Sequence, residues 1–130
     1  MRYEAPTTIA AAVKLLAGKA GLARVLAGGT DLLVQMRTER IAPDLIVDVK
    51  RIAGMRAIKP EKGGFRIGAA VAGAELGEHK ALRNLWPGVV EAANLIGSVQ
   101  IQSRATLAGN LCNASPAADS VPALVAAGAS

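Results

Sequence analysis

The fold of this chain depends on the stretch Leu26-Ala27-Gly28-Gly29-Thr30-Asp31-Leu32-Leu33, which joins an apolar run, 23–27, to a helical pattern that continues to Thr38. The apolar run predicts a buried strand. Glycine adopts positive φ angles and lets a phosphate approach the backbone, and a helix start offers free N–H groups and the positive end of its dipole. The stretch therefore predicts a phosphate-binding turn. Taken alone, it is more often an ordinary tight turn with Thr30 or Asp31 capping the helix, because it matches neither G-x-G-x-x-G nor a P-loop.

A second stretch, Thr106-Leu107-Ala108-Gly109-Asn110, has the same ingredients: a hydroxyl, small residues and an amide. It continues through 111–119, where Asn, Ser and Asp side chains crowd an otherwise small and apolar segment. Buried polar groups at this density need hydrogen-bond partners, and a polar ligand would supply them. We therefore expect a second ligand-binding loop here, or else an irregular loop whose polar groups are satisfied by its own backbone.

The flanking pattern alternates helices with strands. An edge strand is expected at 2–4, and a helix is expected between the N-cap hydroxyls of Thr7 and Thr8 and its end at Gly18. Lys62-Gly63-Gly64 predicts the turn of a hairpin. The other expected elements are the strands 45–49, 55–59 and 65–69 and the helices 74–82, 88–96 and 119–127. This order predicts a mixed α/β (α+β) architecture.

Composition excludes several classes of protein. The 130 residues are enough for one modest domain. A hydrophobic content of 52% with 19% charged residues excludes a disordered chain. With one Tyr, one Phe and one Trp, the chain lacks the aromatic platforms on which nucleic-acid bases stack. The net charge of +5 is scattered, as on a solvated surface, although it is compatible with holding a pyrophosphate.

Other chemistries are also excluded by the sequence. The single cysteine, Cys112, allows neither an internal disulfide nor an iron–sulfur cluster bound by this chain alone. No residues have metal-ligand spacing, and no nucleophile–base pair is visible, so no catalytic or metal-binding residue is assigned. The start lacks the apolar core of a signal peptide, and no stretch resembles a membrane span. A cytoplasmic protein without nucleic-acid or membrane partners is therefore expected.

Together, Leu26–Leu33 and Thr106–Asp119 closely resemble the two cofactor motifs of the FAD-binding (medium) subunits of molybdenum hydroxylases. These are the subunits of the xanthine dehydrogenase and aerobic carbon monoxide dehydrogenase type. The resemblance starts at Tyr3-Glu4-Ala5-Pro6, a typical opening in this family, and continues to the end of the chain. Two long motifs in the right order and at a suitable separation make it specific, whereas either motif alone would not.

The resemblance implies that 1–130 is an FAD-binding domain with the two-subdomain fold of the vanillyl-alcohol-oxidase (PCMH-type) group. A first α/β subdomain would occupy about 1–55, and 56–130 would begin a second, α+β subdomain. The sequence ends on a helix C-terminus, Ala126-Ala127-Gly128-Ala129-Ser130, with nothing after it to complete a core. We therefore expect the domain to be truncated at its C-terminal end.

The resemblance also implies contacts to FAD. Leu26–Leu33 would wrap the pyrophosphate, and Thr106–Asn110 would contact the pyrophosphate and ribityl region from the second subdomain. Asp119 matches the family's acidic residue that contacts the cofactor. Ile96 aligns with a position that is aromatic in some relatives, which implies a place near the flavin. Ala108 replaces a second glycine found in many members, so its methyl group affects one close backbone contact.

In function, the resemblance implies electron transfer rather than bond-making catalysis in this chain. Its partners would be a molybdopterin-binding large subunit and an iron–sulfur small subunit, with NAD or another final acceptor. The flavin itself carries the redox chemistry, and the protein positions it. The alternatives are a stand-alone flavin oxidoreductase of the same superfamily and a non-redox nucleotide-binding module.

The remaining polar and aromatic candidates have weaker functional interpretations. Cys112 is expected to pack as a small apolar residue, and His79 is expected on the surface. Gln100 and Gln102 lie near the second motif, where they would contact the flavin ring or remain solvated. Trp86 is expected to anchor a core or an interface.

Overall fold

A buried parallel strand lies at the centre of the first sheet of the computed structural model, which describes residues 1–18 and 21–130. This strand is β3 (Leu45–Asp48), and it pairs in parallel with β1 (Arg2–Glu4) on one side and β2 (Ala23–Leu26) on the other. All of β3 is buried, as is usual for the centre of a parallel sheet. The strands expected at 2–4, 23–27 and 45–49 are therefore present.

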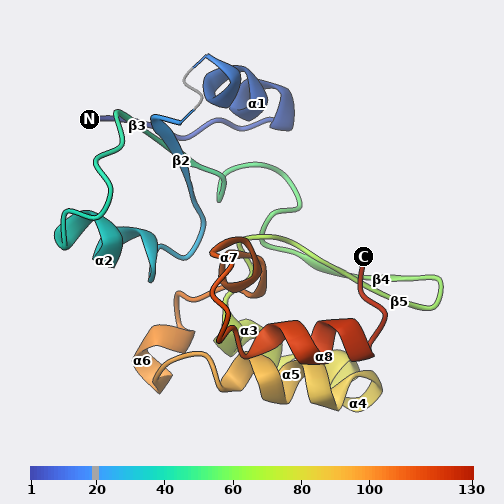
Figure 1. Cartoon of the computed structure of the whole chain (residues 1–130). Coiled ribbons are helices and arrows are strands. Elements are labelled where there is room, and N and C mark those ends of the chain that lie inside the picture. The colour runs from blue at the N-terminus through green and yellow to red at the C-terminus, as the bar shows by residue number, and fades with distance from the viewer. Residues whose placement is uncertain (19–20) are drawn as a thin grey trace.

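Helix α1 (Ile9–Ala17) packs against β3 and completes the first hydrophobic core (Figure 1). Its N-cap is Thr8, whose Oγ1 accepts a hydrogen bond of 3.2 Å from the N–H of Ala11. The helix ends at Gly18, as expected. The buried members of this core come from α1, from β3 and from the segment after it: Ala12, Leu45, Val47, Val49 and Ile52.

The second sheet is an antiparallel hairpin of β4 (Ile58–Glu61) and β5 (Gly64–Ile67). Gly63 takes a φ of +84° at the turn, which only glycine adopts readily. The predicted hairpin is confirmed, but its strands are shifted relative to 55–59 and 65–69. Met55 belongs instead to a turn before the hairpin, where its N–H bonds to the carbonyl of Ile52.

Short helices form the rest of the chain. The helices in chain order are α2 (Leu32–Arg37), which follows the first sheet's β2, and then α3 (Gly73–Glu78), α4 (Lys80–Leu85), α5 (Pro87–Asn94), α6 (Val99–Gln102), α7 (Leu107–Cys112) and α8 (Ser120–Ala126). Five of them, α3, α4, α5, α7 and α8, pack around a second hydrophobic core (Figure 1). The buried side chains of this core include Leu76, Leu82 and Val90, and Trp86 packs against its edge as expected.

The single helix expected at 74–82 is wrong, because His79 divides it into α3 and α4. His79 has an extended backbone (φ −77°, ψ 94°), and its Nδ1 accepts a hydrogen bond of 3.1 Å from the N–H of Leu82. Its ring meets Phe65 edge-on at a centroid distance of 5.5 Å. His79 is therefore a half-buried helix cap rather than a free surface side chain.

No helix among the described residues is long and apolar enough to cross a bilayer.

Candidate ligand-binding site between two loops

The first loop connects β2 to α2 and owes its shape to Gly29. This glycine has a φ of +86°, and a Cβ placed on it would lie 2.9 Å from Cδ1 of Leu26. Asp31 occupies the N-cap position of α2, but its side chain forms no capping hydrogen bond. The expected cap by Asp31 is therefore wrong, and the first turn of α2 keeps its free N–H groups.

The backbone N–H groups of this loop have no hydrogen-bond partner in the part of the chain that the structure describes. From Gly28 to Leu32, no N–H reaches a backbone acceptor among the described residues, and the first internal bond runs from the N–H of Leu33 to the carbonyl of Gly29 at 3.0 Å. Successive free N–H groups in a turn form a concave anion-binding surface. The loop can therefore bind an anionic group without help from a charged side chain.

The second stretch is the first turn of helix α7 rather than an open loop. Thr106 is buried at the N-cap, and its Oγ1 accepts a hydrogen bond of 2.9 Å from the N–H of Gly109. A Cβ on Gly109 would lie 2.7 Å from that oxygen, so a side chain here would have to shift the Thr106 hydroxyl. Asn110 Oδ1 accepts a hydrogen bond of 2.5 Å from the hydroxyl of buried Ser120. The side-chain oxygens of Thr106 and Asn110 are thus hydrogen-bonded within the fold.

The two loops meet at Gly28. A Cβ on this residue would lie 2.0 Å from the carbonyl oxygen of Arg104, just before the second stretch. The backbone of the first loop therefore packs directly against the backbone that precedes α7. A second link joins Gln35 of α2 to Asn113, whose Oδ1 accepts a hydrogen bond of 2.9 Å from Gln35 Nε2.

A cavity of about 520 Å³ lies between the first loop and the first turn of α7. It brings together most of the residues assigned to the cofactor from the sequence: Ala27, Gly28, Gly29, Thr30, Asp31, Leu32, Ile96, Thr106, Ala108, Gly109 and Asn110. Four of the assigned residues do not line it. Leu26 and Leu33 flank Gly29, Leu107 is buried in the second core, and Asp119 is exposed at the start of α8.

Sequence reasoning missed further residues of the cavity wall: Arg24, Val25, Gln35, Ile41, Val49, Ala69, Ala105, Cys112 and Asn113. Some of them follow from the periodicity of the elements. Val25 alternates with Ala27 on one face of a strand, and Gln35 lies one helical turn after Asp31. Ile41 and Ala69 come from segments between elements, and no local pattern indicates them.

A buried carboxylate anchors the first loop from behind. Asp48, only 5% exposed, accepts hydrogen bonds from the Tyr3 hydroxyl (2.5 Å) and from the backbone N–H of Lys50 (2.9 Å). The Lys50 ammonium lies 2.7 Å from Asp48 Oδ2 and also donates to the carbonyl of Ala27 at 3.1 Å. Asp48 was expected only as a strand residue, and this network had no signal in the sequence.

The network shifts two pKa values. Burial raises the pKa of Asp48, but the hydrogen bonds from Lys50 and Tyr3 outweigh burial and hold the pKa below its usual value. The hydrogen bond that the Tyr3 hydroxyl donates to Asp48 raises the pKa of Tyr3 above its usual value, with burial adding to the effect. At neutral pH Asp48 is therefore ionised and Tyr3 is protonated.

The other polar candidates have different places. Cys112 is exposed and lines the cavity, so its expected packing role is wrong. Gln102 donates its Nε2 to the carbonyl of Asn94 at 2.5 Å, which commits its amide to the fold. Gln100 is exposed outside the cavity wall. Within the described part of the chain, no group of His, Cys, Asp or Glu side chains is arranged to hold a metal ion.

Known proteins are similar in sequence to this chain over nearly its whole length. The family model for the "FAD binding domain in molybdopterin dehydrogenase" matches residues 1–130. The xanthine dehydrogenase FAD-binding subunit of Escherichia coli O157:H7 is 38% identical over 125 residues, which is 95% of this chain and 42% of that protein. The carbon monoxide dehydrogenase medium chain of Hydrogenophaga pseudoflava is 34% identical over 117 residues, which is 90% of this chain and 41% of that protein.

Solved structures share the fold. Reconstituted CO dehydrogenase from Oligotropha carboxidovorans contains a chain that matches with a TM-score of 0.87 and 33% identity, over 92% of this chain and 42% of that one. The mixed arrangement of helices and strands described above is thus that of a known fold. The chain spans less than half the length of these relatives. Because the family model matches residues 1–130 of this chain, the chain belongs to the family of FAD-binding domains of molybdopterin dehydrogenases.

Proposed function

We propose that FAD binds in the cavity between the two loops, with its pyrophosphate on the free N–H groups of Gly28 to Leu32. The observation that carries this proposal is that the successive residues Gly28 to Leu32 line the cavity and that their N–H groups have no partner among the described residues. Backbone N–H groups at a helix start bind phosphate well because they point outward and are not neutralised by internal acceptors. The first turn of α7 would contact the pyrophosphate and ribityl region from the opposite wall.

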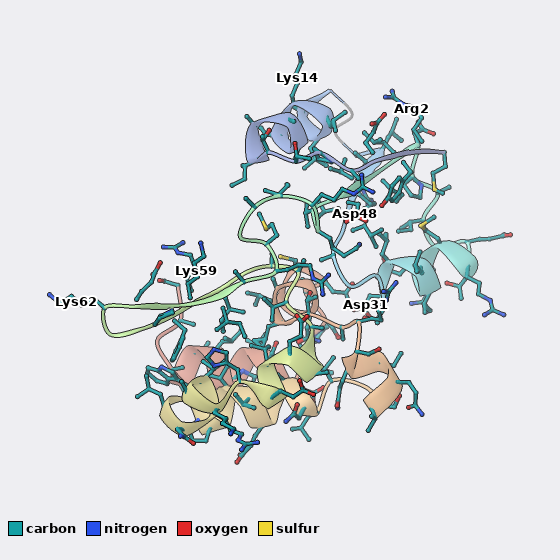
Figure 2. The ribbon with its side chains drawn as sticks, turned by 180° about the vertical axis from the view of Figure 1, so that it is seen from behind. Arg2, Lys14, Asp31, Asp48, Lys59 and Lys62 are labelled. Atoms are coloured by element: carbon teal, nitrogen blue, oxygen red, sulfur yellow. The ribbon has the colours of Figure 1, made fainter. Side chains whose placement is uncertain are left out.

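The residues of the cavity fit such a ligand. A volume of about 520 Å³ lies within the range of about 300–1,000 Å³ that is typical of ligand sites. Glycine at 28 and 29 leaves no side chain over the loop. Arg24 also lines the cavity, but its guanidinium donates to the carbonyls of Gly21 (3.0 Å) and Ala23 (2.9 Å), so the proposal does not depend on its charge. Asp31 lies at the N-terminal end of α2 (Figure 2) and brings a negative charge to the cavity. Because a carboxylate repels a phosphate, we place the pyrophosphate against the backbone of the loop rather than against this side chain.

Two further contacts are part of the proposal. Ile96 lines the cavity on the side of the short helices, where an apolar side chain can pack against the flavin ring. Asp119 lies outside the cavity wall and is exposed, so its contact with FAD requires the cofactor to extend beyond the cavity. Ala108 lines the cavity in the first turn of α7, where its methyl group would affect only one close approach of the backbone.

The architecture that we propose is the two-subdomain FAD-binding fold of the vanillyl-alcohol-oxidase (PCMH-type) group. The presence of two separate hydrophobic cores supports it: one is built from 12–55 and the other from 58–127. These cores agree with a first subdomain of about 1–55 and a second that begins near 56. Because the chain spans less than half of its relatives, we propose that it is the N-terminal portion of the FAD subunit.

At the level of the complex, we propose an electron-transfer subunit of a molybdopterin-dependent dehydrogenase. Electrons would arrive from an iron–sulfur subunit, after oxidation of the substrate on a molybdopterin subunit, and leave to NAD or another acceptor. The bound flavin would supply the redox chemistry, while this chain binds and orients it. Relatives of this chain are named as subunits of caffeine, xanthine and carbon monoxide dehydrogenases. The similarity of these subunits, despite the different compounds in their names, supports the proposal that another subunit selects the substrate.

The test is to purify the full-length protein from its native host and measure flavin, iron and molybdenum together. We expect FAD in an equimolar amount to this chain, with iron and molybdenum in the same complex. A protein that contains no flavin and takes up no added FAD would contradict the proposal. FAD without co-purifying iron and molybdenum would instead indicate a stand-alone flavin oxidoreductase.

A further inference from the structure

The first loop is held from behind by a side chain that does not line the cavity. Lys50 follows β3, and its ammonium makes two contacts: 2.7 Å to Asp48 Oδ2 and 3.1 Å to the carbonyl oxygen of Ala27. Ala27 is the residue that precedes the double glycine and lines the cavity. Lys50 therefore connects a buried carboxylate of the central strand directly to the backbone of the loop.

The rest of the loop is restrained by helix α2 itself. The carbonyls of Gly29 and Asp31 accept hydrogen bonds from the N–H groups of Leu33 (3.0 Å) and Gln35 (2.9 Å), which orients the peptide planes that carry the N–H groups of Thr30 and Leu32. The last sheet contact before the loop is the hydrogen bond of 3.1 Å from the N–H of Val49 to the carbonyl of Leu26. Beyond that point, Lys50 fixes the Ala27 carbonyl, and with it the peptide plane that carries the N–H of Gly28.

We propose that Lys50 is a positioning residue for the cofactor, which holds the Ala27–Gly28 peptide so that the N–H groups of the loop converge on the pyrophosphate. This inference rests on the proposed function. Lys50 acts through the backbone and does not touch FAD. Asp48 acts one step further back, because its two oxygens fix the position of the ammonium and of the Lys50 backbone.

The chain offers a matched control for this role. Tyr3 and Lys50 each donate a hydrogen bond to Asp48, but only Lys50 reaches the loop. Lys50→Met removes the bond to Asp48 together with the bond to Ala27, whereas Tyr3→Phe removes a bond to Asp48 alone. If Lys50 only stabilises the fold, the two variants should bind FAD with similar affinity. If Lys50 positions the loop, Lys50→Met should bind FAD more weakly than Tyr3→Phe.

The experiment measures the dissociation constants of FAD and of ADP, which carries the pyrophosphate without the flavin, on the full-length protein freed of flavin. We expect Lys50→Met to weaken both ligands by roughly tenfold, which is the effect of losing one charged hydrogen bond. Tyr3→Phe should stay within about twofold of the wild type, and Lys50→Arg should recover part of the loss because it restores a cationic donor. Circular dichroism checks that each variant is folded.

Three results would overturn the inference. These are equal losses in Lys50→Met and Tyr3→Phe, unchanged affinity in Lys50→Met, and loss of FAD affinity without loss of ADP affinity. If Lys50→Met does not fold, Lys50→Gln replaces it in the test. The glutamine side chain is polar but ends one bond short of the lysine ammonium and carries no charge, so the same weakening of FAD and ADP binding is expected. Failure of the wild type to bind FAD would instead contradict the proposed function.

Discussion

At the scale of single residues, each glycine of the site has a different role. Gly29 is needed for its backbone conformation, with a φ of +86°, whereas Gly109 leaves room for the Thr106 hydroxyl, which a side chain would have to shift. Gly28 is needed because the Arg104 carbonyl oxygen occupies the space of its missing Cβ. The double glycine was expected to make room for a phosphate; its first member lines the cavity and also allows the close contact with the backbone of Arg104.

Gly29→Val should abolish FAD retention by distorting the loop. A valine at a positive φ is strained by about 1–2 kcal/mol, and its Cβ would lie 2.9 Å from Cδ1 of Leu26, so the loop must move. The matched control is Gly63→Val at the hairpin turn, where φ is +84° and a Cβ meets no atom within 4 Å. Both variants should lose stability in urea unfolding, but only Gly29→Val should lose FAD. Equal flavin content in the two variants would sink the assignment.

The ionised Asp48 should make stability depend on pH in the acid range. Its pKa is lower in the folded chain than the usual value of 3.8, so its contribution is fully present above that value and is lost as the pH falls through the folded pKa. Asp48→Asn should cost about 2–3 kcal/mol at neutral pH and should flatten the loss of stability as the pH falls below the usual carboxyl pKa. Urea unfolding of both proteins across this range measures the difference. Parallel curves would show that Asp48 is not responsible.

At the scale of elements, the cap of α7 joins fold and site. Thr106→Val should cost about 1 kcal/mol, because the N–H of Gly109 loses its acceptor. Since this turn forms one wall of the cavity, FAD should also bind less tightly. Thr106→Ser keeps the oxygen and should restore both properties. Thermal unfolding and FAD titration together test this pair, and a serine variant that behaves like valine would show that the hydroxyl does not act as a cap.

The strands and most of the helices, including the short helices α2 and α8, followed from sequence patterns, but α6 and α7 did not. Strand β3 has a continuous apolar run, and α1 begins at a threonine cap and ends at Gly18, so local chemistry specifies each of them. Helix α7 has six residues and lies in a polar segment without helical periodicity, so it was expected to be a loop. The break at His79 depends on a side-chain cap and on packing against Phe65, which only tertiary structure supplies.

At the scale of the whole molecule, the cavity is assembled by residues that lie far apart in the chain. The Gln35–Asn113 hydrogen bond and the Gly28–Arg104 contact join segments that belong to different hydrophobic cores. Motif resemblance placed both loops at one site because it carried information about a whole family. Composition and periodicity alone left each loop as an ordinary turn, since neither describes contacts between distant segments.

The central claim is that the N–H groups of Gly28 to Leu32 hold the pyrophosphate of FAD. Hydrogen–deuterium exchange on the full-length protein, with and without FAD, tests it most directly because exchange reports on those same N–H groups. We predict that FAD slows exchange from Gly28 to Leu32 and leaves the hairpin turn at Lys62-Gly63-Gly64 unchanged. FAD that binds while Gly28 to Leu32 exchange at their original rate would contradict the claim.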